Sequence, residues 1–224
     1  MIGIILQARM GSSRLPGKVL REIGGKTLLE HIFYRVAFLK HPARVVLATS
    51  ANRRDDAIEV LCRERNIECF RGSEDNVLER YYLCAKKYGI AHIVRLTGDN
   101  PFTDIEELDN LIDLHLKTRS DYTHSFGVLP VGVGAEIFTF RALEQSYENA
   151  TKENHREHVN EYIQEHPELF KIKVLSISKE KNRPDVRLTV DTEDDYLRAT
   201  FIVKNSESGY ITTEEAIGLC LRYA

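Results

Sequence analysis

The sequence predicts an α/β protein: a three-layer, Rossmann-like fold in which helices cover both faces of a mostly parallel sheet. Short apolar runs alternate with segments of helical periodicity through the first two-thirds of the chain, and the connections are short. The 224 residues are 42% hydrophobic and 29% charged, a composition typical of a globular protein with a substantial core. No repeat, low-complexity tract or linker interrupts the chain, so we expect one domain over residues 1–224.

Four short apolar runs in the first half have the length expected of buried strands, and they cover residues 3–7, 44–49, 67–70 and 91–96. Helical periodicity marks the segments between them. The first helix begins at a capping box formed by Thr27 and Glu30. The second runs from Asn52, and its inward positions are Ala57, Ile58, Val60 and Leu61. The third covers residues 77–85.

The remaining elements are less regular. Thr103 with Glu106 predicts the start of a fourth helix. Further strands are expected over residues 121–126, 134–140, 170–177 and 187–190. Further helices are expected over residues 154–166 (stopped by Pro167), from a Thr192–Asp195 cap through Val203, and over 213–221.

Charge and cysteine content exclude several classes of protein. A net charge of −3 argues against nucleic-acid binding by bulk electrostatics. No apolar run approaches the ~20 residues that span a bilayer, and the run Ile2–Leu6 is too short for a signal peptide. We therefore expect a cytoplasmic protein without nucleic-acid or membrane partners. The cysteines form no C-x-x-C pair, which predicts structural thiols at Cys62, Cys69, Cys84 and Cys220.

A basic loop follows the first predicted strand. Arg9, Arg14 and Lys18 arrive before any acidic residue, among two glycines, two serines and a proline. Cations together with exposed backbone amides suit a polyphosphate, and the alternative is a solvated basic loop. The loop is not a P-loop, because the spacing from Gly11 to Lys18 is one residue too long and Val19 replaces the metal-binding hydroxyl.

Two carboxylates, Asp99 and Asp191, follow predicted strands. The carboxyl ends of parallel strands form the ligand-binding edge of such a sheet. Mg²⁺ takes one or two carboxylates together with substrate phosphates, so the pair is a candidate metal site. The alternatives are a turn residue before Pro101 for Asp99, and a helix N-terminal carboxylate beside Thr192 for Asp191.

Five segments, LQARMGSSRLPGKVL, GSEDNVLERY, RLTGDNPFTD, NHREHVNEYI and RLTVDTEDDYLRA, resemble the cytidylyltransferase family. This family makes CMP-activated 3-deoxy-octulosonate and sialic-acid-like sugars, and the resemblance is closest to its spore-coat-polysaccharide branch. It implies a fold of the nucleotide-diphospho-sugar transferase type and a homodimer. It also implies transfer of CMP from CTP to an acidic or modified sugar, with release of pyrophosphate, in the biosynthesis of surface polysaccharides or glycoconjugates.

The resemblance assigns roles by position. Arg9, Arg14 and Lys18 match phosphate-binding cations, Asp99 matches the catalytic carboxylate, and Asp99 with Asp191 matches the Mg²⁺ ligands. The nucleotide-binding positions are Ala8, Gly11, Ser12, Ser13, Arg71, Ser73, Thr97 and Gly98.

Several questions stay open in the sequence. Thr97 stands where the 3-deoxy-octulosonate enzymes carry a glutamine, which leaves the base open. Gly134 stands where the related branch often has an aspartate, which leaves the acceptor open. His155 and His158 could share a helix face as a metal pair, border the acceptor pocket or dimer interface, or lie on a polar surface. Two other functions remain: a glycosyltransferase on the same fold and a non-catalytic nucleotide-binding protein.

Overall fold

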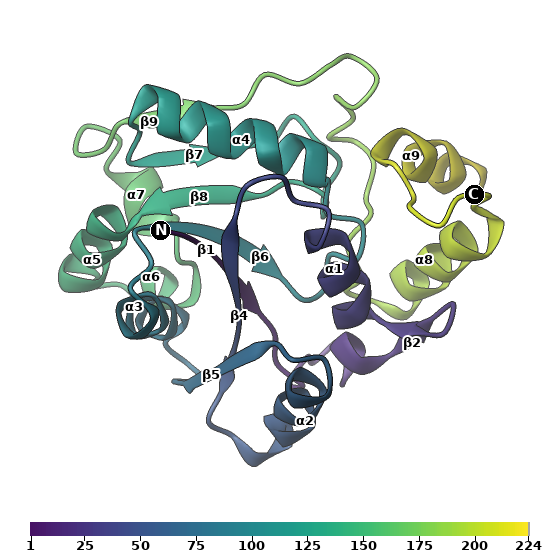
Figure 1. Ribbon diagram of the computed structural model, residues 1–224, viewed down its shortest axis with the longest axis horizontal. Coiled ribbons are helices and arrows are strands. Elements are labelled where there is room, and N and C mark those ends of the chain that lie inside the picture. The colour runs from purple at the N-terminus through teal and green to yellow at the C-terminus, as the bar shows by residue number, and fades with distance from the viewer. Residues whose placement is uncertain (224) are drawn as a thin grey trace.

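The computed structural model describes residues 1–223 and is built around a seven-stranded sheet (Figure 1). Its strand order is β5-β4-β1-β6-β8-β7-β9. The strands are β1 (Ile2–Gln7), β4 (Ala43–Ser50), β5 (Glu68–Gly72), β6 (His92–Thr97), β7 (Tyr122–His124), β8 (Glu136–Thr139) and β9 (Ile172–Val174). All neighbouring pairs are parallel except those of β8, which runs antiparallel to β6 and β7. The predicted α/β class with a mostly parallel sheet is confirmed.

The strand order reverses beside β1. From β1 the chain moves outward to β4 and β5, then returns across β1 to form β6 on its other side. Gln7 at the end of β1 lies opposite both Ala48 of β4 and Thr97 of β6. After β1 the chain continues to β4 on one side, whereas after β6 it continues to β7 and β8 on the other side. Open α/β sheets bind ligands at such a point, where the strand order reverses.

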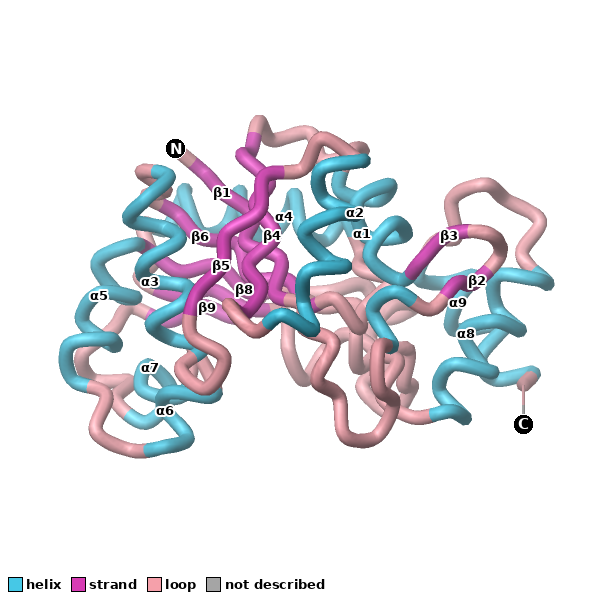
Figure 2. The backbone as a smooth tube through the Cα atoms, turned by 90° about the horizontal axis from the view of Figure 1, so that it is seen from below, coloured by secondary structure: helices cyan, strands magenta, loops and turns pink. Residues whose placement is uncertain are grey.

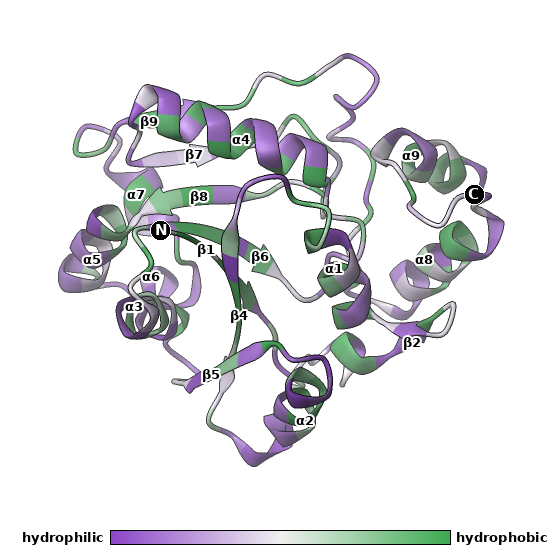
Figure 3. Ribbon diagram, viewed as in Figure 1, coloured by the Kyte–Doolittle hydropathy of each residue, from purple (hydrophilic) through white to green (hydrophobic). Residues whose placement is uncertain are grey.

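Helices cover both faces of the sheet (Figures 1 and 2). They are α1 (Leu28–Val36), α2 (Asp56–Glu64), α3 (Val77–Tyr88), α4 (Ile105–Thr118), α5 (Phe140–Asn149), α6 (Glu153–Glu157), α7 (Glu161–Glu165), α8 (Glu193–Asn205) and α9 (Thr213–Arg222). Successive residues of β1 face opposite sides, so Ile4 and Leu6 pack with α1, α2 and α4, whereas Ile5 packs with α3 and α5. Figure 3 shows β1 and β4 as hydrophobic, as expected of strands covered on both faces.

A third hydrophobic cluster joins the C-terminal helices to the rest of the molecule. Residues of α8 and α9, such as Ala199 and Ile217, pack with Ile23 and Leu28. Ile23 belongs to a small antiparallel pair, β2 (Glu22–Ile23) and β3 (Lys26–Thr27), which the sequence analysis did not identify. Figure 2 shows this pair beside α8 and α9 at one end of the molecule.

Helix starts follow their capping residues. The predicted capping box of α1 is confirmed, because the Glu30 amide donates to Thr27 Oγ1 at 3.2 Å and the Thr27 amide to Glu30 Oε2 at 2.8 Å. The cap predicted for α4 is wrong by one residue. Its N-cap is Asp104, which accepts from the Glu107 amide at 2.9 Å, whereas Thr103 donates to the Asn100 carbonyl.

Two inward positions predicted for α2 are wrong. Ile58 and Leu61 are buried, but Ala57 and Val60 are exposed. The helix begins at Asp56 and is short, so only one narrow stripe faces the sheet. Residues 57 and 60 lie on the opposite side of that stripe.

The single helix predicted over residues 154–166 is wrong. The chain forms α6 and α7 with a break between them, and His158 has the extended angles φ −112° and ψ 106°. His155 is buried and its Nε2 contacts Glu165 at 2.9 Å, so the two histidines do not share a helix face. The predicted strand at 187–190 is also wrong, because that segment pairs only through a single bridge between Arg187 and Val131.

The described part of the chain, residues 1–223, contains no helix that is long and apolar enough to cross a membrane. All four cysteine thiols are free; Cys62 and Cys84 are buried, and Cys69 and Cys220 are partly buried.

Candidate active site

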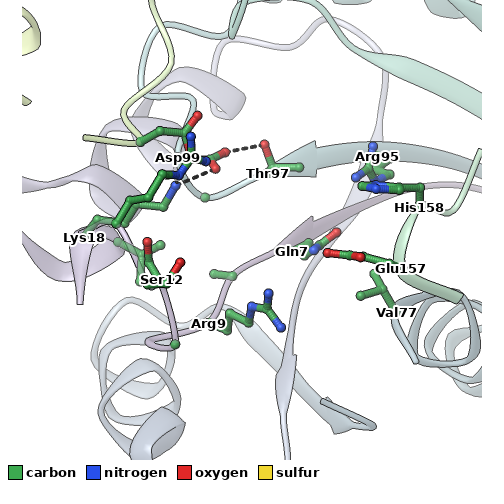
Figure 4. Close-up of a pocket in the computed structure, with 17 residues that line it drawn as sticks. Gln7, Arg9, Ser12, Lys18, Val77, Arg95, Thr97, Asp99, Glu157 and His158 are labelled. Atoms are coloured by element: carbon green, nitrogen blue, oxygen red, sulfur yellow. Dashed lines mark hydrogen bonds and ion pairs between the residues drawn. The ribbon is translucent and has the colours of Figure 1, made fainter. Parts of the chain in front are cut away.

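Two adjoining cavities open at the carboxyl ends of β1 and β6. The first, of about 590 Å³, is formed mainly by the loop that follows β1 (Figure 4). The second, of about 460 Å³, lies toward β7 and β8. Both are large enough for a small-molecule ligand. Four residues line both cavities: Arg95, Thr97, Asp99 and Asp191.

Lys18 ties three distant parts of the chain together in the first cavity. Its Nζ donates to Asp99 Oδ2 at 2.8 Å, to Asp191 Oδ1 at 2.8 Å and to the Val190 carbonyl at 3.0 Å. Gly17, at φ 69°, turns the backbone in the left-handed region directly before Lys18, a conformation that favours glycine. The lysine side chain is only 10% exposed, so this ammonium is held by the protein and is not a solvated surface charge.

Asp99 is fixed by the tight turn that leaves β6. Thr97 Oγ1 donates to Asp99 Oδ1 at 2.6 Å, and the Gly98 amide donates to the Gln7 carbonyl at 2.7 Å. A Cβ at position 98 would lie 3.0 Å from Ala8 Cβ. Glycine at position 98 lets the exits of β1 and β6 approach this closely without displacing Ala8, which brings the basic loop to Asp99.

Asp191 precedes Thr192, the N-cap of α8, and its carboxylate contacts two arginines besides Lys18. Arg14 Nη2 lies 3.0 Å from its Oδ1, and Arg187 Nη2 lies 2.5 Å from its Oδ2. Burial alone would raise the pKa of Asp191, but Lys18, Arg14 and Arg187 outweigh it and hold this pKa below its usual value. Asp191 is therefore an anion at neutral pH. The capping box predicted for α8, of Thr192 and Asp195, is confirmed.

The cavity collects most of the residues that the sequence predicted. Those lining it are Ala8, Arg9, Gly11, Ser12, Ser13, Arg14, Lys18, Thr97, Gly98, Asp99 and Asp191. The cations divide into two groups within it. Lys18 and Arg14 contact the carboxylates, whereas Figure 4 shows Arg9 apart from the Lys18–Asp99 pair.

Two predicted nucleotide-binding residues do not line either cavity. Arg71, at the end of β5, donates through Nη1 to Asp56 at 2.6 Å and to Glu59 at 2.8 Å. Ser73 accepts from the Asn76 amide at 3.0 Å, at the start of α3. Both side chains thus make local contacts at the edge of the sheet.

Several residues that line the cavities were given no site role from the sequence, among them Gln7, Val77, Arg95, Glu157 and Arg187. His158, for which a place at the acceptor pocket was one of the expectations, lines the first cavity. One signal was available for Arg95. It precedes Thr97 by two residues on the same strand, so both side chains must share a face. Glu157 is the last residue of α6, and His158 lies at the cavity where the chain becomes extended, a break that no local pattern predicted.

Three buried polar atoms at the cavities lack a partner within the described residues. They are Gln7 Oε1, Arg95 Nε and Asn100 Oδ1. Buried polar atoms in native proteins are nearly always hydrogen-bonded, so these three atoms need partners, such as ordered water, that the protein itself does not supply.

The donor set also fits a divalent cation. The Lys18 ammonium lies at equal distance from Asp99 and Asp191, with a backbone carbonyl as a third neighbour, so this position already attracts positive charge. Over residues 1–223 no group of three or more His, Cys, Asp or Glu side chains gathers around a point. The remaining ligands of a metal would therefore come from phosphate and water, as Mg²⁺ prefers.

The second cavity combines apolar walls with arginine. Phe126 and Val131 contribute apolar surface, and Arg187 stands at the edge shared with Asp191. Gly134 lines this cavity, and a Cβ there would lie 2.9 Å from Ser125 Oγ. Ser125 thus fills the space that the first atom of an aspartate would need, and this wall contributes no carboxylate.

Comparisons with known proteins agree with this geometry. The cytidylyltransferase family model matches residues 3–219. The spore coat polysaccharide biosynthesis protein SpsF of Bacillus subtilis is 40% identical over 197 residues, which cover 86% of this chain and 82% of the relative. A solved cytidylyltransferase from Leptospira borgpetersenii superposes with a TM-score of 0.92 at 33% identity, covering 99% of this chain and 94% of that one.

More distant structures share the fold. A solved CMP:2-keto-3-deoxy-manno-octonic acid synthetase in complex with CTP superposes with a TM-score of 0.69 at 17% identity, over 91% of this chain and 98% of that one. The sheet and its connections are thus those of the nucleotide-diphospho-sugar transferases. With a family match that spans nearly the whole chain, and with the loop cations and the two carboxylates facing one cavity, this chain belongs to the cytidylyltransferase family.

Proposed function

We propose that this protein transfers CMP from CTP to a hydroxyl group of an acidic or modified sugar and releases pyrophosphate. One observation carries the proposal: cations of the β1 loop and carboxylates from two distant segments converge on one cavity. Lys18, Arg14 and Arg187 contact Asp99 and Asp191, and Arg187 also contacts Asp195, so three cations are matched by three carboxylates. Such a site suits a polyanion that arrives with its own metal ion.

In the proposed reaction the acceptor oxygen bonds to the α-phosphorus. The bond from this phosphorus to the oxygen that bridges to the β-phosphorus breaks, and pyrophosphate leaves with that electron pair while the hydroxyl proton passes to solvent. Arg14 and Lys18 neutralise the charge that develops on the leaving group, and the fixed cavity walls hold donor and acceptor in line.

Asp99 and Asp191 are the residues that would hold Mg²⁺. When bound, the ion would supply positive charge that stabilises the phosphates and would make the acceptor hydroxyl easier to deprotonate. The Lys18 ammonium now contacts both carboxylates, so we expect it to turn toward the phosphates when nucleotide and metal enter.

The second cavity supports the choice of acceptor. Arginine at its edge favours an anionic group, and Phe126 and Val131 favour an apolar substituent or sugar face. SpsF is named for spore coat polysaccharide biosynthesis, and we propose a comparable place for this chain in surface polysaccharide or glycoconjugate synthesis. The proposal includes a homodimer, which light scattering after gel filtration would test.

The direct test measures pyrophosphate released from CTP, with Mg²⁺ and a panel of acidic sugars. We expect Asp99→Asn and Asp191→Asn each to lower turnover by about a hundredfold or more, the usual effect of losing one charge-stabilising contact. EDTA should abolish turnover. Normal turnover in both variants would contradict the assignment.

The same assay separates the other functions. A glycosyltransferase would consume a CMP-sugar and release no pyrophosphate from CTP. A non-catalytic binding protein would bind CTP without turnover on any sugar. Competition among CTP, UTP, ATP and GTP for binding decides the base, which Thr97 leaves open.

A further inference from the structure

Arg95 stands in the wall between the two cavities and lines both. It lies on β6, directly opposite Glu136 of β8 in the antiparallel register. Its Nη1 donates to Glu136 Oε1 at 2.6 Å. The arginine side chain is 15% exposed and the glutamate is fully buried, so the pair forms an inner wall whose guanidinium reaches the cavities.

Further hydrogen bonds fix the side chain of Glu136. Tyr122 donates its hydroxyl to Glu136 Oε2, and Asn160 Nδ2 donates to the same hydroxyl at 3.2 Å. Asn160 belongs to the break between α6 and α7, next to the cavity-lining His158. Every oxygen of Glu136 is therefore used, and Arg95 has a fixed anchor on one of its nitrogens.

One nitrogen of the guanidinium is left for a ligand. Arg95 donates through Nη1 to Glu136, whereas its Nη2, which unlike Nε is not fully enclosed, makes no hydrogen bond among residues 1–223. A buried Arg–Glu pair contributes little net stability, because desolvation offsets its attraction. The position of the Arg95–Glu136 pair where the two cavities meet is better explained by a ligand that binds the unused donors of Arg95.

The proposed reaction fixes which atom lies at that junction. The nucleotide fills the first cavity and the acceptor hydroxyl reaches from the second, so the α-phosphorus must lie where they meet. Of the four residues that line both cavities, Asp99 and Asp191 are anionic, Thr97 is neutral, and Arg95 is the cation. Lys18 and Arg14 line the first cavity, with the carboxylates that would hold the metal.

We propose that Arg95 binds the α-phosphoryl group of the nucleotide and that Glu136 positions its guanidinium for this contact. The proposal rests on the proposed function and deepens it. The proposal assigns the cations to different phosphates. Arg95 contacts the phosphoryl group that is transferred, whereas Arg14 and Lys18 contact the pyrophosphate that leaves.

The test uses three probes that separate these parts: cytidine, CMP and inorganic tripolyphosphate, each titrated calorimetrically with Mg²⁺ present. The variant is Arg95→Gln combined with Glu136→Gln, which removes both charges and leaves no unpaired carboxylate in the wall. We expect its CMP affinity to fall at least tenfold, since a charge-assisted contact is lost. Affinities for cytidine and tripolyphosphate should stay within twofold of wild type.

Glu136→Gln alone tests the positioning role. It keeps the cation but weakens its anchor, so CMP affinity should fall by a smaller factor than in the double variant, with tripolyphosphate unchanged. A glutamate that only stabilises the fold would lower the melting temperature and leave the ratio of CMP to tripolyphosphate affinity as in wild type, which would overturn this part.

A matched control is available on the same sheet. Arg44 and Glu68 form an exposed Arg–Glu pair between β4 and β5, with Nε to Oε2 at 2.5 Å, away from both cavities. Arg44→Gln with Glu68→Gln should change none of the three affinities. Unchanged CMP affinity in the Arg95 double variant, or an equal fall for all three probes, would overturn the proposal. Wild-type protein that bound neither CMP nor CTP would instead overturn the proposed function.

Discussion

Lys18 is a buried cation whose partners lie about 80 and 170 residues away in the chain. Its ammonium contacts the two carboxylates that would ligate a metal, so the free protein already carries a positive charge there. Arg14 and Arg187 add further positive charge beside Asp191. In the absence of nucleotide, a divalent ion must therefore displace the Lys18 ammonium and approach the guanidinium groups of Arg14 and Arg187.

This arrangement predicts that Lys18→Met increases metal binding in the absence of nucleotide. The substitution frees both carboxylates and removes one repelling charge at close range. We expect the affinity for Mn²⁺, used as a paramagnetic substitute for Mg²⁺, to rise at least tenfold, measured by electron paramagnetic resonance of the free ion. CTP affinity should fall in the same variant.

The control adds Asp99→Asn to Lys18→Met. With one carboxylate neutral, the gain in Mn²⁺ affinity should disappear, while the space left by the lysine is the same. Equal Mn²⁺ binding by wild type and Lys18→Met would mean that the ammonium does not compete for this position.

Individual site residues were predictable where chemistry and spacing agreed. The charges of Arg14, Lys18, Asp99 and Asp191 could be read from loops that follow apolar runs, and the structure brings all four to one cavity. Arg95 was not singled out, because an arginine inside a strand pattern gives no sign that an opposing buried glutamate will anchor it. That pairing depends on β8 lying antiparallel beside β6, which the sequence does not specify.

At the scale of elements, the close approach of the β1 and β6 exits depends on Gly98. An added Cβ would meet Ala8 Cβ at 3.0 Å and the Gln7 carbonyl oxygen at 3.3 Å. Gly98→Ala should destabilise the protein by about 1–3 kcal/mol and weaken CTP binding, because overpacking pushes the basic loop from Asp99. Urea denaturation and calorimetry measure the two effects.

Gly218 offers a matched glycine. It lies on an exposed position inside α9, and a Cβ there would meet nothing within 4 Å. Gly218→Ala should stabilise the protein by about 0.5–1 kcal/mol, the difference in helix propensity, and leave CTP affinity unchanged. Equal effects of the two substitutions would show that space at Gly98 is not limiting.

A histidine pair joins β6 to α4. His92 Nδ1 lies 3.1 Å from His115 Nε2, and His115 Nδ1 lies 3.1 Å from Thr123 Oγ1. Burial, with a smaller effect of His92, lowers the pKa of His115 to about 4. The unfolded chain binds this proton near pH 6.5, so stability present above that pH is lost as pH falls toward 4.

We therefore expect the His115 site to reduce the free energy of unfolding by about 2 kcal/mol between pH 7 and pH 5. His115→Gln should show a flatter dependence over this range in urea titrations at each pH. Burial lowers the pKa of His92 as well, so some dependence should remain in the variant. An identical slope in both proteins would mean that His115 titrates normally.

Helices and strands could be predicted from the sequence where a local pattern, such as a capping box, marks them. The capping boxes of α1 and α8 fixed those helix starts, because side chain and backbone satisfy each other within four residues. Residues 187–190 have the composition of a strand, but their backbone amides donate to Val131 and Asp99, which lie outside the strands. Across the break between α6 and α7, His155 contacts Glu165 ten residues further on, a contact that helical periodicity does not predict.

For the whole molecule, the site is the meeting point of segments that the fold alone brings together. The β1 loop, the exit of β6 and the segment before α8 each contribute charge, and their hydrophobic supports belong to different clusters. Lys18 links all three in the free protein through Asp99, Asp191 and the Val190 carbonyl. A ligand that takes over these contacts should stabilise the folded chain as a unit.

We therefore expect CTP with Mg²⁺ to raise the melting temperature. At a nucleotide concentration a hundred times Kd, binding adds about 2.7 kcal/mol to the free energy of unfolding, or about 5–10 °C for a chain of this size. The shift should shrink when EDTA replaces Mg²⁺, because the triphosphate then faces Asp99 and Asp191 without a bridging cation. UTP at the same concentration should give a smaller shift if the base is read, and an equal shift would place recognition in the phosphates alone.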